Sequence, residues 1–305
     1  MKKFLLNIFI FTFLSLILGE VIVRANRLNQ EVPQRTVDNN GIQKFIPNQK
    51  GYWATGEHSW QVNKLGWSGE LPQNYDNLVS IIGDSYIANF MNPVECHQNI
   101  FLKKQLPEYN FVEAGRPGVT FIEAVEISQN LTPLKPNYHI IYARNNDFIE
   151  SIQEVRNYSD RTQISLERAK IIPGQLKYAQ AKKILYNWKL AFYFFNRLAT
   201  PAAENKESEI NSKAQKKFKH LAKVEKLLEL TSDRYDISNI ILTLHPDTAP
   251  AIVKKAQEVG FKTILLEKKE ENWSFEHDNH WTCYGHERVS VQVGTGFKKA
   301  FNSVN

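Results

Sequence analysis

The sequence predicts an α/β fold built on a five-stranded parallel sheet. Two observations lead to this prediction: five short apolar runs rich in β-branched residues, and segments of helical composition that separate them. Neighbouring parallel strands need a long return path, which a helix packed on the sheet supplies, so we expect helices on both faces. With 305 residues, 42% of them hydrophobic, the chain is long enough for a large core and is not a disordered protein.

The expected elements follow one another along the chain. Strands are expected at 79–82, 110–114, 138–142, 240–244 and 262–266. Helices are expected at 93–106, 120–131 and 250–259. Gly260 supports the end of the last helix, because glycine adopts the left-handed conformation that terminates many helices.

A long insertion is expected between the third and fourth strands, at about 150–238. Its composition is helical and poor in glycine. Between 151 and 232 it has sixteen Lys or Arg against eight Asp or Glu, a larger surplus than the net charge of +6 of the whole chain. No nucleic-acid-binding motif accompanies these basic residues, so we expect no nucleic-acid partner.

The insertion contains an unusually aromatic segment at 184–195, flanked by Lys182, Lys183 and Arg197. An aromatic helix in an inserted subdomain usually forms that subdomain's own hydrophobic core, and this is the interpretation we favour. Aromatic and basic residues together also suit a membrane interface or a polymeric anionic ligand. The sequence leaves this alternative open.

The N-terminus has the pattern of a membrane-spanning helix. Lys2 and Lys3 precede an apolar run at 4–23, close to the roughly 20 residues that cross a bilayer. A cleaved signal peptide would share this pattern, but the nearest candidate cleavage site has Arg24 between Val23 and Ala25, where small residues are required. We therefore favour a retained, uncleaved anchor.

This interpretation divides the chain into three parts. The expected anchor is 1–27, and a connector with an N-terminal extension follows at 28–76. The main domain is expected at 77–305 and includes the insertion.

A candidate nucleophile follows the first expected strand. Gly83-Asp84-Ser85 places a hydroxyl at the carboxyl edge of the sheet, where ligands of open α/β sheets bind. By itself this is weak, because Asp84 and Ser85 could simply cap a helix. A partner lies near the C-terminus, where Asp278 and His280 follow the last expected strand, and a serine nucleophile requires such a histidine and carboxylate.

Two further segments follow strands that should neighbour the first. They are 115–118, which contains Gly118, and 144–147, which contains Asn146. Glycine and asparagine can direct N–H donors at a negatively charged oxygen. These four segments, in this order, resemble the SGNH hydrolase superfamily, also called the GDSL esterase family, over most of 79–289. The resemblance implies a flavodoxin-like three-layer sandwich with a helical insertion and an N-terminal transmembrane helix.

The resemblance also implies roles for residues of this chain. Ser85 is expected to be the nucleophile, with His280 and Asp278 completing the triad. The oxyanion hole is expected to use the backbone N–H groups of Ser85 and Gly118 and the side-chain amide of Asn146. Segments 62–67 and 285–286 are similar to those of bacterial membrane-anchored members.

The chain departs from the family pattern at three places. Glu113 stands where asparagine is usual, Arg144 stands where glycine is usual, and Asp278 and His280 are one residue closer together than in D-x-x-H. Because Arg144 and Arg116 lie on the expected site loops, we expect them, with Asp84, to contact the substrate and to favour an acidic one.

Other interpretations of these residues remain open. His277 is the main competitor of His280 for the catalytic role, because His277 and His280 have the usual three-residue spacing but lack its aspartate. A metal site at His277, Asp278 and His280 is a separate alternative, which no other ligand cluster supports. Two cysteines, Cys96 and Cys283, could pair outside the cytoplasm, but their number does not establish this. We expect no metal and no cofactor.

The expected function is that of a serine esterase, deacetylase or acyl transferase. Family and location favour ester-linked acyl groups, for example O-acetyl groups of a bacterial cell-surface polysaccharide. The expected location is the cytoplasmic membrane, with a single span and the catalytic domain on the extracytoplasmic side. A lipid ester is a second possible substrate, and an inactive glycan-binding or assembly protein is the non-enzymatic alternative.

Overall fold

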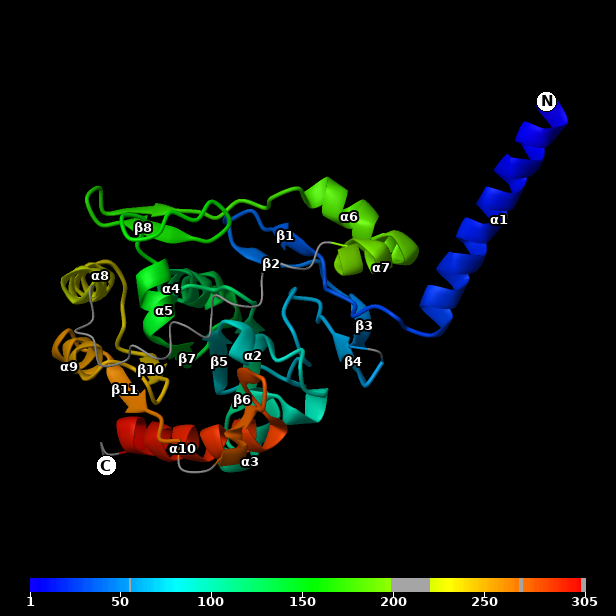
Figure 1. The fold of residues 1–305 in the computed structure, drawn as a ribbon. Coiled ribbons are helices and arrows are strands. Elements are labelled where there is room, and N and C mark those ends of the chain that lie inside the picture. Colours follow the sequence, from blue (N-terminus) through cyan, green and yellow to red (C-terminus); the bar gives the residue numbers. More distant parts are fainter. Residues whose placement is uncertain (55, 199–219, 269–270, 303–305) are drawn as a thin grey trace.

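The computed structural model describes residues 1–54, 56–198, 220–268 and 271–302. Its centre is a parallel sheet of five strands (Figure 1), which run in the spatial order β11-β10-β7-β5-β6. The strands are β5 (Leu78–Gly83), β6 (Asn110–Gly115), β7 (Tyr138–Ala143), β10 (Ile240–Leu244) and β11 (Lys262–Leu265). All five predicted strands are therefore confirmed. In chain order of these strands the arrangement is 2-1-3-4-5, the flavodoxin-like order, as expected.

Helices cover both faces of this sheet, so the fold has three layers. One face packs against α4 (Phe121–Asn130), α8 (Leu221–Arg234) and α9 (Pro250–Glu258). The other face packs against α3 (Gln98–Gln105) and α10 (Cys283–Asn302). Successive strand residues alternate between the two cores: Ile82 and Ile141 lie in the first, and Ile81 and Ile140 in the second. This alternation leaves the strand ends as the place for polar chemistry.

The N-terminal extension forms two antiparallel hairpins, which the sequence analysis described only as a connector. They consist of β1 (Arg35–Val37), β2 (Gln43–Phe45), β3 (Lys50–Trp53) and β4 (His58–Gln61). Ile42 and Trp67 are buried in the same core cluster as α4. The extension therefore packs directly on the sheet domain, although the domain boundaries themselves stay a prediction.

The insertion contains helices, as expected, and also a β-hairpin that was not predicted. After α5 (Asn145–Glu150) comes an antiparallel hairpin of β8 (Gln163–Ser165) and β9 (Lys170–Ile172). The Gln163 side chain donates to the backbone oxygens of Glu150 and Arg156, which anchors the hairpin to α5. Helices α6 (Ala179–Asn187) and α7 (Lys189–Leu198) follow, and residues 199–219 lie outside the described part.

The aromatic segment 184–195 is not a subdomain core, contrary to the interpretation we favoured. Among its residues Phe192 is buried at 6% exposure, whereas Ile184, Trp188, Phe194 and Phe195 are exposed. The hydrophobic core of the insertion comes instead from α8, whose buried leucines and valine pack on the sheet.

Helix α1 (Lys2–Ala25) projects away from the body (Figure 1). Its length and mean hydropathy are sufficient to cross a membrane, and only 6% of its apolar window is buried, so it is not a core helix. A signal sequence would have the same features. The last turns of α1 pack against α7, at the base of the projecting helix.

Candidate active site

The turn after β5 presents Ser85 at the carboxyl edge of the sheet. Asp84 caps the short helix α2 (Ser85–Ala88), and its carboxylate accepts the backbone N–H of Tyr86 at 3.0 Å. Asp84 is buried and Ser85 is partly exposed, so the hydroxyl is accessible from solvent while the turn is held in place. The capping role and the exposed hydroxyl are thus divided between two neighbouring residues.

A small hairpin carries the candidate histidine and acid. It consists of β12 (Ser274–Phe275) and β13 (Asp278–Trp281), neither of which was predicted. In a strand, side chains two residues apart point to the same side. His280 Nδ1 and the Asp278 carboxylate are therefore hydrogen-bonded, and the same carboxylate accepts the His280 backbone N–H at 2.8 Å.

The other ring nitrogen of this histidine faces the serine. His280 Nε2 lies 2.7 Å from Ser85 Oγ, across 195 residues of sequence. The short Asp278–His280 spacing is thus suited to an extended segment, where the three-residue spacing would direct the carboxylate to the opposite side. His277, by contrast, lies on the hairpin turn with its side chain 89% exposed beside Glu276. The geometry gives it no contact with the serine.

Three links hold the histidine strand against the serine turn. The Tyr86 hydroxyl donates to the Asn279 backbone oxygen at 2.9 Å, and the Asn92 amide donates to the Trp281 backbone oxygen at 2.9 Å. A disulfide joins Cys96, in the short helix η1 (Val94–Cys96), to Cys283, the first residue of α10. The pairing that the sequence left undecided is therefore present in the structure. Its second cysteine, Cys283, lies three residues after His280.

The Tyr86 ring is part of the same assembly. It stacks on the His280 ring with 4.8 Å between centroids, and burial raises the pKa of its hydroxyl. The hydroxyl consequently stays protonated and keeps its bond to β13. The ring limits the rotation of the imidazole that faces Ser85.

The two candidate oxyanion residues follow the strands on either side of β5. Gly118 follows β6 with φ of +80°, a conformation that favours glycine. Asn146 lies in the first turn of α5, after β7, and its partly exposed side chain forms no hydrogen bond with the described residues. Its neighbour Asn145 is occupied, because its amide donates to Asp247 and its oxygen accepts the N–H of Ala249. Of these two neighbouring asparagines, Asn146 is therefore the one whose side-chain amide remains available.

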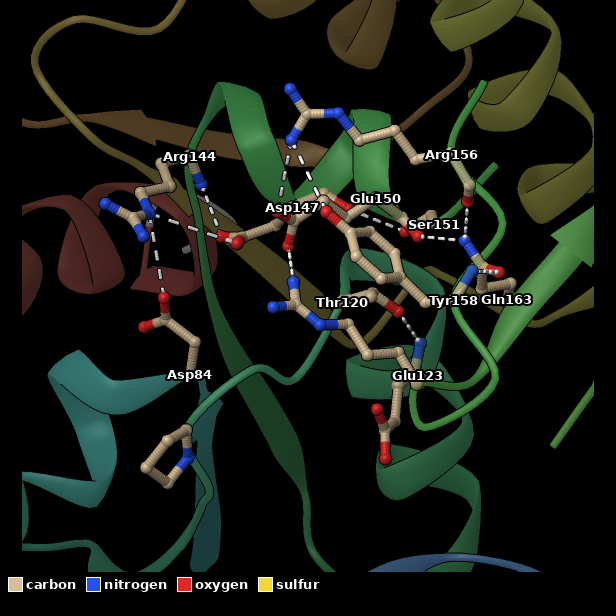
Figure 2. Close-up of polar contacts among 12 residues, drawn as sticks. Asp84, Thr120, Glu123, Arg144, Asp147, Glu150, Ser151, Arg156, Tyr158 and Gln163 are labelled. Carbon is tan, nitrogen blue, oxygen red and sulfur yellow. Dashed lines mark hydrogen bonds and ion pairs between the residues drawn. The ribbon is translucent and has the colours of Figure 1, made fainter. Parts of the chain in front are cut away.

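Arg144 lies between two carboxylates (Figure 2), Asp84 at 3.6 Å and Asp147 at 4.0 Å. Its backbone N–H also donates to Asp147 at 2.9 Å, which closes the turn into α5. Burial, and then the nearby Asp84, raise the pKa of Asp147 well above its ordinary value. Arginine in place of the usual glycine therefore joins the turn that carries Ser85 to the turn that carries Asn146.

The expectation that Arg116 contacts substrate is wrong. Its side chain is fully buried, with its guanidinium donating to the Glu123 carboxylate and to the backbone oxygens of Gln43 and Pro117. These contacts fasten the N-terminal hairpin to the loop before Gly118. Arg116 thus stabilises the loop from the buried side, away from solvent.

A different arginine, Arg161, stands beside the candidate oxyanion loop. Its guanidinium lies 3.6–3.9 Å from the position that a Cβ of Gly118 would occupy, and it pairs with Glu150. Burial lowers the pKa of Arg161. No sequence signal distinguished this arginine from the others of the insertion. Only the return of the β8–β9 hairpin to the sheet edge brings it here.

A pocket with about 260 Å³ of empty space opens next to the serine turn. Its lining includes Tyr86, Arg144, Thr243, His245, Leu266 and Trp281. The hydroxyl oxygen of Thr243 is buried without a hydrogen-bond partner in the described structure. The pocket thus combines aromatic walls with an available hydroxyl. Tyr86 separates it from His280.

Comparisons with known proteins give weak likenesses. No family model and no curated protein matches the chain. Among solved structures, TesA is similar at 10% identity, with a TM-score of 0.38 and coverage of 73% of this chain and 99% of that one. The esterase EstA from Pseudoalteromonas sp. is similar at 10% identity, with a TM-score of 0.40 and coverage of 74% and 100%.

A third solved structure bears the name of the family that the motifs suggested. A G-D-S-L family protein from Desulfitobacterium hafniense is 14% identical, with a TM-score of 0.37 and coverage of 72% of this chain and 99% of that one. The chain is similar to G-D-S-L family structures. At this level the likeness assigns no chemistry, which has to come from the residues.

Proposed function

We propose that this protein is a serine hydrolase of the SGNH type, acting through an acyl-enzyme on Ser85. The observation that carries the proposal is the contact of His280 Nε2 with Ser85 Oγ at 2.7 Å, with Nδ1 bonded to Asp278. A neutral imidazole has one N–H and one acceptor nitrogen. When Nδ1–H donates to the carboxylate, Nε2 is the acceptor and can take the serine proton.

The proposed reaction follows from this arrangement. His280 takes the proton of Ser85 as its oxygen attacks the ester carbonyl, and the Asp278 carboxylate stabilises the imidazolium. The oxyanion is held by the N–H groups of Ser85 and Gly118 and by the Asn146 amide. His280 then gives its proton to the leaving alkoxide, so the ester C–O bond breaks and the acyl group remains on Ser85. Water or a sugar hydroxyl accepts the acyl group in the second half-reaction.

The proposed substrate is a short acyl ester, such as an O-acetyl group of a bacterial cell-surface polysaccharide. The pocket beside the serine turn is lined by the rings of Tyr86, His245 and Trp281, which leave little room for a long acyl chain. The disulfide is typical of oxidising compartments. Together with the apolar helix α1, the disulfide favours a single-pass protein with this site on the extracytoplasmic side of the cytoplasmic membrane.

A lipid ester is the second candidate substrate, favoured by the exposed apolar side chains of α6 and α7 beside α1. The inactive alternative has less support. Glu113, one of the departures from the family pattern, is buried and accepts hydrogen bonds from His97 and the Asn99 N–H, away from the serine. It therefore leaves the triad contacts unaffected.

A fluorophosphonate probe tests the proposal, because it reacts with activated serines. The full chain in detergent is labelled, and Ser85→Ala and His280→Ala are not, if the proposal holds. A folded wild-type chain that fails to react would refute it. The substrate is then tested with p-nitrophenyl acetate against p-nitrophenyl palmitate: a higher kcat/KM for acetate supports the short acyl group, and the reverse supports the lipid ester.

A further inference from the structure

The region around α6 and α7 has no part in the chemistry proposed above. Outside α1, it carries the most exposed apolar side chains among the residues that the structure describes. Phe194 and Phe195 of α7 are each 52% exposed and Leu198 is 81% exposed. On α6 and the following residue, Ile184 is 68% and Trp188 is 47% exposed. Such a concentration on a soluble surface usually marks an interaction site.

The exposed apolar side chains of α7 lie on one face of that helix. Ala191, Phe194, Phe195 and Leu198 are spaced i, i+3, i+4 and i+7, which places them along one side of α7. Phe192 lies on an adjacent side of the helix, is 6% exposed, and packs edge-on against Tyr186 with 5.1 Å between ring centroids. Helix α7 is thus held to the protein on one side and leaves an apolar stripe on another. We call the stripe the α7 face.

The α7 face lies at the base of α1, and polar contacts fix it there. The Glu20 carboxylate accepts the backbone N–H groups of Lys189 and Leu190 at 3.1 and 2.7 Å, so it caps the start of α7. Arg24 donates to the Asn187 backbone oxygen at 2.5 Å. These contacts join α7 to α1 rather than leaving the two helices to move independently.

Apolar packing continues the same junction. A Cβ at Gly19 would lie 2.9 Å from a methyl group of Leu190, so the missing side chain allows α7 to approach α1 closely. Asn29 adds a hydrogen bond to the Lys189 backbone oxygen at 2.6 Å. The junction is formed by both helices and by the chain that leaves α1.

The depth of this junction follows from helix geometry. From Lys3 to Glu20 the axis of α1 rises by about 26 Å at 1.5 Å per residue. The hydrocarbon core of a bilayer is about 30 Å thick. If Lys3 lies at one interface, Glu20 and the start of α7 lie at the other, where an amphipathic helix rests between headgroups and acyl chains.

The residues around the α7 face suit that position. Lys182, Lys183 and Arg197 are exposed cations that can meet anionic headgroups. Trp188 and Tyr193 are the residue types enriched at membrane interfaces, and the Arg197 guanidinium lies over the Tyr193 ring at 3.5 Å.

We propose that α6 and α7 lie in the interface of the membrane that α1 spans, with the α7 face inserted among the acyl chains. The occupant of the face is therefore the lipid surface. Together, α1 and α7 form two connected contacts with one bilayer. The catalytic body is thereby held in one orientation relative to the membrane.

A spin label on the α7 face tests this in the full chain, reconstituted in vesicles of phosphatidylethanolamine and phosphatidylglycerol. Phe195→Cys is the test position. Leu14→Cys, in α1, is the reference inside the bilayer, and Lys254→Cys, with a side chain 79% exposed on α9, is the reference in water. Cys96 and Cys283 are joined, so the unsubstituted chain provides the unlabelled background.

Collisions with oxygen and with a water-soluble nickel complex distinguish the possible occupants. We expect frequent oxygen collisions at Phe195 and nickel collisions at least about tenfold less frequent than at Lys254, because a polar complex is excluded from hydrocarbon. Nickel collisions equal to those at Lys254 would place the face in water and overturn the proposal. Infrequent collisions with both reagents would indicate a protein surface and also overturn it.

At a half-exposed position the label leaves the core packing intact, and Phe194→Cys gives a second, independent reading of the same face. Circular dichroism and the intact disulfide on a non-reducing gel establish that each labelled chain is folded. The result does not depend on fluorophosphonate reactivity, so the two proposals fail or stand separately.

Discussion

Two histidine–aspartate pairs stand at the same edge of the sheet, and only one of them faces a nucleophile. His280 bonds Asp278, and His245 Nδ1 lies 2.5 Å from Asp247 Oδ1. Both rings contact Tyr86, with centroid distances of 4.8 and 5.7 Å. In each pair the partners are two residues apart. By sequence spacing and carboxylate contact the two are equivalent.

The two pairs differ in what the second ring nitrogen of the histidine contacts. His280 Nε2 reaches Ser85 Oγ, whereas the His245 ring lies parallel to Trp281 at 6.3 Å and lines the pocket. The difference arises from the supporting elements: β13 is a hairpin strand carried back over the serine turn, while His245 simply follows β10. His280 is thus a candidate base, and His245 is not, because the β12–β13 hairpin brings His280 to Ser85.

The largest expected effect comes from exchanging each histidine. His280→Ala should lower kcat/KM by about 10⁴-fold or more, because it removes the proton acceptor of Ser85. His245→Ala is the matched control and should lower it by less than about tenfold, the equivalent of 1.4 kcal/mol of lost pocket contacts. Hydrolysis of p-nitrophenyl acetate measures both. Equal losses in the two variants would contradict the distinction between the pairs.

A smaller effect is expected from Asn146. Its neighbour Asn145 has a hydrogen-bonded side chain, whereas the amide of Asn146 is available to a ligand. Asn146→Ala should lower kcat by about 10²–10³-fold with little change in KM, because an oxyanion donor acts mainly in the transition state. Asn146→Asp keeps the size but places negative charge near the oxyanion, and should be worse. If Asp restored activity, Asn146 would serve only to shape the turn.

The smallest effect concerns stability and a histidine without a carboxylate partner. His139 is buried in β7, bonded to Ser80 Oγ at 2.7 Å, and burial lowers its pKa from 6.5 to about 4. Between these values the unfolded chain binds more protons than the folded one, so stability falls as pH falls from 6.5 to 4. The shift corresponds to at most about 3 kcal/mol.

Urea unfolding of wild type and His139→Gln in the same detergent, at pH 7 and pH 4.5, measures this contribution. The wild type should lose more stability between the two pH values than the variant does. Burial also lowers the pKa of His286, so some dependence should remain in the variant. An identical loss in both chains would contradict the assignment to His139.

The central fold was predictable because its strands are fully buried apolar runs. In β5 and β10 every residue is buried, and such runs carry a strong local signal. The hairpins β8–β9 and β12–β13 were not predicted, since their strands have two to four residues and are held by tertiary contacts. The element that carries Asp278 and His280 was therefore expected in the right place without its strand conformation.

The arginines show where sequence reasoning about the site stops. Arg116 and Arg144 both follow strands at the expected edge, yet one is buried against Glu123 and the other lies beside Asp84. Sequence position does not give the direction of a long side chain. Arg161 reaches Gly118 only through the fold of the insertion. The strand ends were thus predictable, and the charges around them were not.

The disulfide closes a loop of the chain that contains most of the central sheet. Cys96 and Cys283 are 187 residues apart, and strands β6, β7, β10 and β11 all lie within that span, while β5 lies outside it. In the chain-entropy model a loop of this size removes roughly 5 kcal/mol of conformational freedom from the unfolded state. When the oxidised chain unfolds and refolds, the histidine segment therefore stays tethered near the serine turn. A break in the backbone between the cysteines leaves both pieces attached.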